Sequence, residues 1–220
     1  MPNWVFNSIG SDEDTINDIK KNYLDESGNF DFNKFIPMPE ALNVTAGSEN
    51  HQDILFYLSE RYALTPEQVK NKPEFQKVFE KFDNFNKKIF ENDMREIRHT
   101  QLPNYDMGKQ LVDNLLTYGS MNWYDWCCEN WDTKWNACDT DANDPQNIHF
   151  NTAWNVPMPI LRKLCEAYPD ADIDIFCEEE SGWYVEFNNN KGELIVVDQG
   201  NVEYNEEDDK SEYVSQNIGF

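Results

Sequence analysis

Basic residues are scarce in this chain of 220 residues. Eighteen lysines and arginines stand against 42 aspartates and glutamates, which gives a formal net charge of −24. A surface of this sign repels phosphate backbones and anionic membranes, so direct binding to nucleic acid or to a membrane surface is not expected. No apolar run approaches the roughly 18 residues that a membrane-spanning helix needs. The composition favours a cytoplasmic protein whose charge either attracts basic proteins or serves solubility alone.

The sequence also lacks the motifs of catalytic, cofactor and metal sites. It has no phosphate-binding loop, no dinucleotide fingerprint and no nucleophile elbow. Its five cysteines are an odd number without a secretory leader before them, which predicts reduced thiols. The spacing of Cys128, Cys138 and His149 matches no zinc pattern, and the loop 139–150 lacks the glycine and the glutamate that a calcium loop requires. We expect no metal, no cofactor and no enzymatic activity.

The acidic residues that are present are unevenly distributed. Residues 1–100 hold 18 acids and 12 bases, whereas residues 101–220 hold 24 acids and 6 bases. Many acids of the second half fall in segments that alternate like strands, so Asp172 and Asp174 share one face opposite two isoleucines. A rigid sheet with such an outer face could imitate DNA phosphates, or it could simply be solvated. The candidate acidic face consists of Asp170, Asp172, Asp174, Glu178, Glu179, Glu180 and Glu186.

The two ends of the chain combine strand and helix signals. Residues 4–9 are apolar-rich and short, which suits a strand, and residues 11–24 have an apolar face at helical spacing. From residue 134 two short strands, a helix at 156–170 and further alternating strands follow. Without the middle of the chain the order is strand, helix, strand, strand, helix, strand. This order predicts an α+β, ferredoxin-like split βαβ fold, with an antiparallel sheet of four to six strands and helices on one face.

Residues 49–101 differ in character from both ends. Helix signals dominate there, and within 73–101 apolar residues recur every three or four positions. We interpret 49–101 as a helical insertion in an α+β domain formed by residues 1–48 and 102–202. The last residues, 203–220, are acidic and weakly patterned, so we expect a loose tail.

Tryptophans are concentrated in the stretch NWYDWCCENWDTKWN at 122–136. Pairs of them are three and four residues apart, so each pair can share one face of a helix. Such a cluster is either an aromatic core between helix and sheet or a partly exposed binding platform. A platform for single-stranded nucleic acid also needs a basic groove, and Lys134 is the only base between residues 110 and 161. The cluster comprises Trp123, Trp126, Trp131, Trp135 and Trp154.

Four stretches of the sequence resemble one known family. They are MPNWVFN at the start, FDFNKFIPMPE at 30–40, NWYDWCCENWDTKWNA at 122–137 and FNTAWNVPMP at 150–159. Together they resemble the YubB-type (Api-like) ferredoxin-like proteins of phages and conjugative plasmids. The resemblance implies a ferredoxin-like fold without an iron–sulfur cluster and an accessory role on a mobile element. It implies no known reaction, and it does not extend over 49–100.

Two classes of function remain as hypotheses. The leading one is a phage or plasmid accessory protein that binds a basic host protein, as an anti-CRISPR or anti-restriction DNA mimic that occupies a DNA-binding defence nuclease in the host cytoplasm. The alternative is a regulatory or structural protein-binding module that uses the helical insertion as its contact surface. An enzyme would require a cleft with convergent polar groups, for which the sequence gives no signal.

Overall fold

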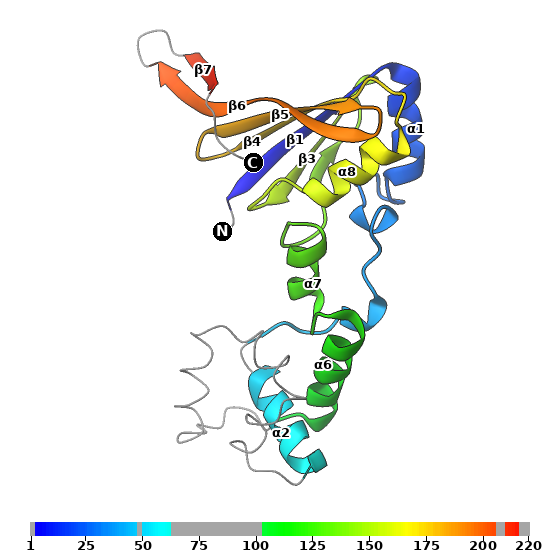
Figure 1. Cartoon of the computed structure of the whole chain (residues 1–220), viewed down its shortest axis with the longest axis vertical. Helices are drawn as coiled ribbons and strands as arrows, with labels where there is room; N and C mark the ends of the chain where they lie inside the picture. The colour runs from blue at the N-terminus through cyan, green and yellow to red at the C-terminus, as the bar shows by residue number, and fades with distance from the viewer. Residues whose placement is uncertain (1–2, 48–49, 63–102, 206–209, 216–220) are drawn as a thin grey trace. The chain divides into compact units, whose positions relative to one another are not determined.

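The chain folds as two compact units, as seen in a computed structural model (Figure 1). A sheet-containing unit is formed by Met1–Met38 and Cys127–Phe220, and a helical unit by Pro39–Trp126. The helical unit extends beyond the predicted insertion 49–101 at both ends. The long helix predicted within 73–101 lies outside the described residues. The structure describes residues 3–47, 50–62, 103–205 and 210–215.

A single antiparallel sheet of seven strands organises the first unit (Figure 1). Its strand order is β2-β3-β1-β4-β5-β6-β7. The strands are β1 (Trp4–Gly10), β2 (Cys138–Asp141), β3 (Asn147–Ala153), β4 (Asp174–Glu179), β5 (Trp183–Asn190), β6 (Glu193–Asn205) and β7 (Lys210–Ser215). Because β1 pairs with both β3 and β4, it separates the two strands that flank the second helix of the unit, which is the split βαβ arrangement. The predicted α+β class with an antiparallel sheet is confirmed.

The sheet has more strands than the four to six predicted, because the region expected to be a loose tail is paired. Residues 203–205 extend β6, and β7 pairs with it antiparallel from Gly200↔Ser215 to Asn205↔Lys210. Pairing satisfies the backbone groups that β7 directs toward β6, although the sequence of this segment gives no clear strand pattern.

Two helices cover one face of this sheet, α1 (Glu13–Tyr23) and α8 (Met158–Ala167). Asp12 caps α1 as expected, since its side chain accepts a hydrogen bond from the Thr15 amide at 3.0 Å. Asn189 of β5 donates to the Tyr168 carbonyl directly after α8, at 2.7 Å. The Tyr168 hydroxyl donates to Asp18 of α1 at 2.9 Å, so the two helices lie together on this buried face.

The other side of the sheet is here called the open face. Side chains alternate between the two faces along each strand, and in β1 Val5, Asn7 and Ile9 are fully buried whereas Phe6 is 41% exposed. The same alternation in β4 buries Ile175 and leaves its neighbours on the open side.

Aromatic side chains from distant segments form the core next to β3. Phe150 stacks on Phe30 with ring centroids 4.8 Å apart and meets Phe32 edge-on at 6.0 Å. Trp131 also meets Phe32 edge-on, and its Nε1 donates to the Ile36 carbonyl at 2.9 Å. The segment that contains Pro37 and Pro39 forms two short 3₁₀ turns, Phe32–Lys34 and Glu40–Leu42.

The helical unit is built on α2 (Asn50–Tyr62) and α6 (Tyr105–Tyr118). Their cores meet through Ile54, Leu58 and Leu111, which are fully buried. Gly108 permits the close approach, because a Cβ there would lie 2.0 Å from the Asp53 carbonyl oxygen. Gly119 ends α6 with φ 81° before α7 (Trp123–Asn130) begins.

Candidate functional site

Three adjacent strands place four carboxylates on the open face. Asp174 and Glu178 lie on β4, Glu186 lies on β5 opposite Phe176, and Asp198 lies on β6 opposite Glu186. With about 3.3 Å per residue and about 4.8 Å between strands, the four fall within an area of about 13 by 10 Å. The open-face positions of β1, β3, β4, β5 and β6 contain no lysine or arginine. This patch therefore has charge of a single sign.

Hydroxyl groups hold two of these carboxylates in place. Oδ2 of Asp198 accepts hydrogen bonds from the Tyr184 hydroxyl at 2.9 Å and the Ser215 hydroxyl at 3.0 Å. These bonds, that from Ser215 first, lower the pKa of Asp198 below its ordinary value. Oε2 of Glu178 accepts from the Tyr213 hydroxyl at 3.0 Å, and burial together with this bond raises the pKa of Tyr213. These bonds hold both carboxylates in fixed positions.

Aromatic rings lie among the carboxylates of the open face. Phe6 stacks on His149 with centroids 5.4 Å apart. Tyr213 meets Phe176 at 5.7 Å and Tyr184 at 5.0 Å, both edge-on. Tyr213 remains 53% exposed despite these contacts. The open face therefore presents anionic groups beside the accessible rings of Phe6 and Tyr213, and exposed aromatic side chains are frequent in protein-binding surfaces.

A hollow of about 820 Å³ adjoins this patch where β1 leads into α1. Its lining includes Asp12, Asp172, Asp174 and Glu186. Asp12 is already engaged as the cap of α1. Among the residues that the structure describes, no group of three or more histidine, cysteine, aspartate and glutamate side chains is arranged to hold a metal ion.

The structure brings together three of the seven acids of the candidate acidic face. Asp174, Glu178 and Glu186 share the open face, and Asp172 borders the adjoining hollow. Asp170 lies exposed in the turn after α8. The prediction from sequence did not include Asp198 or the open-face rings. Only the register of the strands brings these residues together.

Glu179 is separated from this group by the pleat of the strand. It is 3% exposed, and it accepts hydrogen bonds from the Ser181 amide at 2.9 Å and from the Ser181 hydroxyl. Burial opposes ionisation of Glu179, but these bonds keep its pKa below the ordinary value. Its position is that of a turn-stabilising residue. Glu180 follows it, exposed, in the same turn.

The tryptophans do not form one platform. Because α7 ends at Asn130, the prediction that Trp131 and Trp135 share a helical face is wrong. Trp126 and Trp131 are buried, which agrees with the core interpretation. Trp123, on α7, is half-buried and meets Tyr124 edge-on.

The remaining two tryptophans flank a lysine. The Lys134 Nζ lies 4.6 Å from the ring centroid of Trp135 and 5.0 Å from that of Trp154. Trp154 is not part of a strand. It follows β3 directly with φ 77° and is partly exposed. A lysine of the chain itself therefore occupies the cation-binding geometry that these rings provide.

Burial makes Cys127 and Cys165 poor nucleophiles. All five are free thiols, and burial raises the pKa of Cys127 to about 12 and that of Cys165 to about 11. Neutral thiols of this kind are poor nucleophiles.

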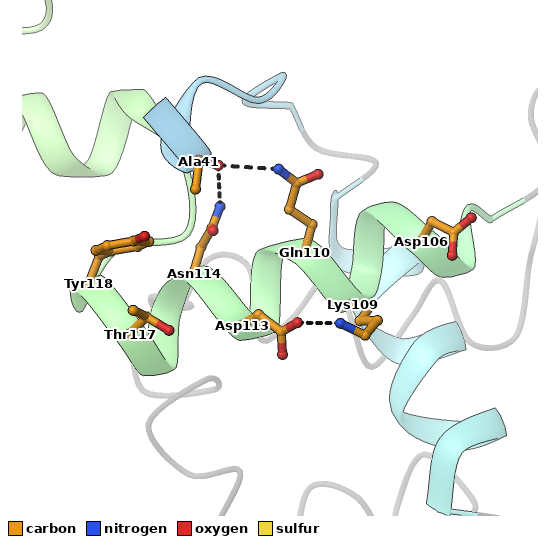
Figure 2. A pocket seen from close by; sticks show the side chains of 8 residues that line it. All are labelled: Ala41, Asp106, Lys109, Gln110, Asp113, Asn114, Thr117 and Tyr118. Atoms are coloured by element: carbon orange, nitrogen blue, oxygen red, sulfur yellow. Dashed lines mark hydrogen bonds and ion pairs between the residues drawn. The ribbon is translucent and has the colours of Figure 1, made fainter. Parts of the chain in front are cut away.

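A second hollow, of about 450 Å³, lies in the helical unit (Figure 2). Lys109 and Asp113, one turn apart on α6, form an ion pair at 2.5 Å. Gln110 and Asn114 both donate to the Ala41 carbonyl, at 3.2 and 2.8 Å. Because these polar groups satisfy one another, this hollow is a weaker candidate than the open face.

No helix in the described part of the chain has the length and apolar character to cross a membrane.

Comparisons with known proteins give one family match. Residues 130–216, which hold β2 to β7 and α8, match the model of the "Ferredoxin-like domain in Api92-like protein". The crystal structure of protein api92 from Yersinia pseudotuberculosis is 12% identical and aligns over 91% of this chain and 98% of that chain, with a TM-score of 0.35. No curated protein matches the sequence. Over residues 130–216 the chain is therefore similar to the ferredoxin-like domain of Api92-like proteins, and its fold is α+β and ferredoxin-like.

Proposed function

We propose that the open face binds a basic surface of another protein and that the chain acts by binding rather than by catalysis. The observation that carries the proposal is the patch of Asp174, Glu178, Glu186 and Asp198, on strands whose described open-face positions hold no lysine or arginine. Surfaces that serve solubility usually intersperse charges of both signs. A one-sign patch instead creates a field that steers a partner of opposite charge.

The partner that we propose is a DNA-binding nuclease of a host defence system, so that the protein acts as a DNA mimic in the host cytoplasm. Carboxylates that hydrogen bonds hold in place keep a fixed spacing, as backbone phosphates do. They also lose less conformational entropy on binding than mobile side chains. The resemblance of several sequence stretches to phage and plasmid proteins supports this setting.

The test is a capture experiment with immobilised full-length protein and host lysate at low and high salt. We expect a captured DNA-binding protein to be released by high salt, by added duplex DNA and by the double substitution E178Q/E186Q. The matched control is E166Q/D170N, which removes the same charge from exposed positions off the open face. The proposal would be refuted if the partner stayed captured at high salt and in the presence of duplex DNA. It would also be refuted if both double variants lost the partner equally.

A second candidate is a protein-binding module that uses the helical unit, which includes the predicted insertion 49–101 but extends beyond it. On α6, Leu116 is 63% exposed and Tyr118 lies partly exposed nearby. Exposed apolar side chains of this size are frequent in contact surfaces. A Leu116→Glu variant should retain its partner if the open face is the binding surface, and should lose it if the helical unit binds.

A further inference from the structure

We propose that the open face prefers arginine to lysine, so that its partner is a protein segment bearing several arginines. This inference rests on the proposed function and specifies the chemistry of the partner for the same surface. It follows from how the rings and carboxylates of the open face are arranged, and not from net charge, which attracts both residue types.

Glu178 has aromatic neighbours on both sides. In the sheet it lies opposite Phe6 on β1 and opposite Tyr184 on β5, and the Tyr213 hydroxyl donates to its carboxylate. Directly opposed open-face side chains have Cβ atoms about 5 Å apart. A cation that approaches Glu178 must therefore pass beside the exposed rings of Phe6 and Tyr213.

A guanidinium group suits these surroundings better than an ammonium group. It is planar and weakly hydrated, so it can stack on a ring with its flat face while its edge donates to a carboxylate. A lysine ammonium is compact and strongly hydrated, and it loses more solvation at a surface that contains rings. Contacts of arginine with aromatic rings are favourable at exposed sites and become stronger when the pair is desolvated.

A second carboxylate lies within reach of the same group. Glu186 is diagonal to Glu178, because Glu178 opposes Tyr184 and Glu186 opposes Phe176. Diagonal neighbours are about 7–8 Å apart, a span that long side chains bridge. The five N–H donors of one guanidinium can therefore bond both carboxylates. Asp198 lies directly opposite Glu186 and offers a further carboxylate for a second arginine.

The test uses two labelled peptides of equal length and net charge, one alternating arginine with serine and the other lysine with serine. Their dissociation constants are measured with full-length protein by fluorescence anisotropy at low salt. We expect the arginine peptide to bind on the order of tenfold more tightly. F6L and Y213L should each reduce this ratio toward one with little change for the lysine peptide, and Y213F should keep most of it because the ring remains. E166Q serves as the surface control.

The outcomes separate this inference from the proposed function. Equal binding of both peptides, lost in E178Q/E186Q, would overturn the arginine preference and leave a basic partner intact. Binding of neither peptide would overturn both. An arginine preference that persists in F6L and in Y213L, with both variants shown to be folded by circular dichroism, would place the selectivity elsewhere and refute the role of these rings.

Discussion

Phe150 and Phe6 are on adjacent strands and face opposite sides of the sheet, so the pair tests which face is open in solution. Phe150 is 1% exposed between Phe30 and Phe32, whereas Phe6 is 41% exposed beside His149. Replacing each phenylalanine by alanine makes the same chemical change in the two environments. Any difference in the free energy of unfolding then reports burial rather than residue type.

The magnitudes follow from the covered area. Full burial of a phenylalanine stabilises by about 3 kcal/mol, and the cavity left by Phe150→Ala adds to the loss, so we expect about 4 kcal/mol. For Phe6 about three-fifths of the side chain is covered, and water can occupy the space left by Phe6→Ala. The expected loss is about 1–2 kcal/mol. The two variants should therefore differ by about 2–3 kcal/mol.

Urea unfolding followed by tryptophan fluorescence and by far-ultraviolet circular dichroism measures this difference. A single transition is fitted only where both probes coincide, because the chain has two units. If Phe6→Ala costs as much as Phe150→Ala, the open face is covered in solution and cannot be the binding surface. If Phe150→Ala costs as little as Phe6→Ala, the aromatic core is not packed as described.

Three further outcomes are expected. Gly200→Ala should detach β7, because a Cβ there would lie 1.9 Å from the Val214 carbonyl oxygen; faster hydrogen exchange of the β7 amides would report it. The pKa of Asp198 is lowered from 3.8 on folding, so its stabilising effect is present above pH 3.8 and is lost as pH falls through the lower folded-state value. The difference in unfolding free energy between wild type and Asp198→Asn should accordingly vanish on acidification below pH 3.8, as pH-dependent urea curves would show. Alkylation at neutral pH, mapped by mass spectrometry, should modify the half-buried thiols before the buried ones. The half-buried thiols are Cys128 and Cys138, and the buried ones are Cys127, Cys165 and Cys177.

Local signals were sufficient to predict most of the sheet-containing unit. Asp12 begins a helix because its side chain bonds the first-turn amides, and the turn at Lys191 and Gly192 has the positive φ angles that a tight hairpin requires. β7 was not predicted, since its stability depends on pairing with β6 rather than on its own pattern. The sequence EEDD at 206–209 also contains no glycine or asparagine to indicate a hairpin.

The candidate site was predictable only in part, for a geometric reason. Alternation alone puts Asp174 and Glu178 on one face and Glu179 on the other, so the same rule that found the patch could have excluded Glu179. Phe6 and Tyr213 are more than 200 residues apart in sequence, and only the strand register brings both beside Glu178. No local pattern contains that information.

The open face keeps its charge at a cost to stability, and this leads to a last prediction. Glu186 and Asp198 are direct cross-strand neighbours, and like charges in that position are destabilising. Glu186→Gln removes the repulsion without changing the shape of the side chain, so it should raise the free energy of unfolding. The same variant should bind the arginine peptide more weakly than wild type. A gain in stability with a loss of binding is the trade-off expected of a functional surface. If the surface serves solubility alone, Glu186→Gln should raise the free energy of unfolding without weakening peptide binding. A Glu186→Gln variant that is less stable than wild type would mean that this carboxylate has a stabilising partner.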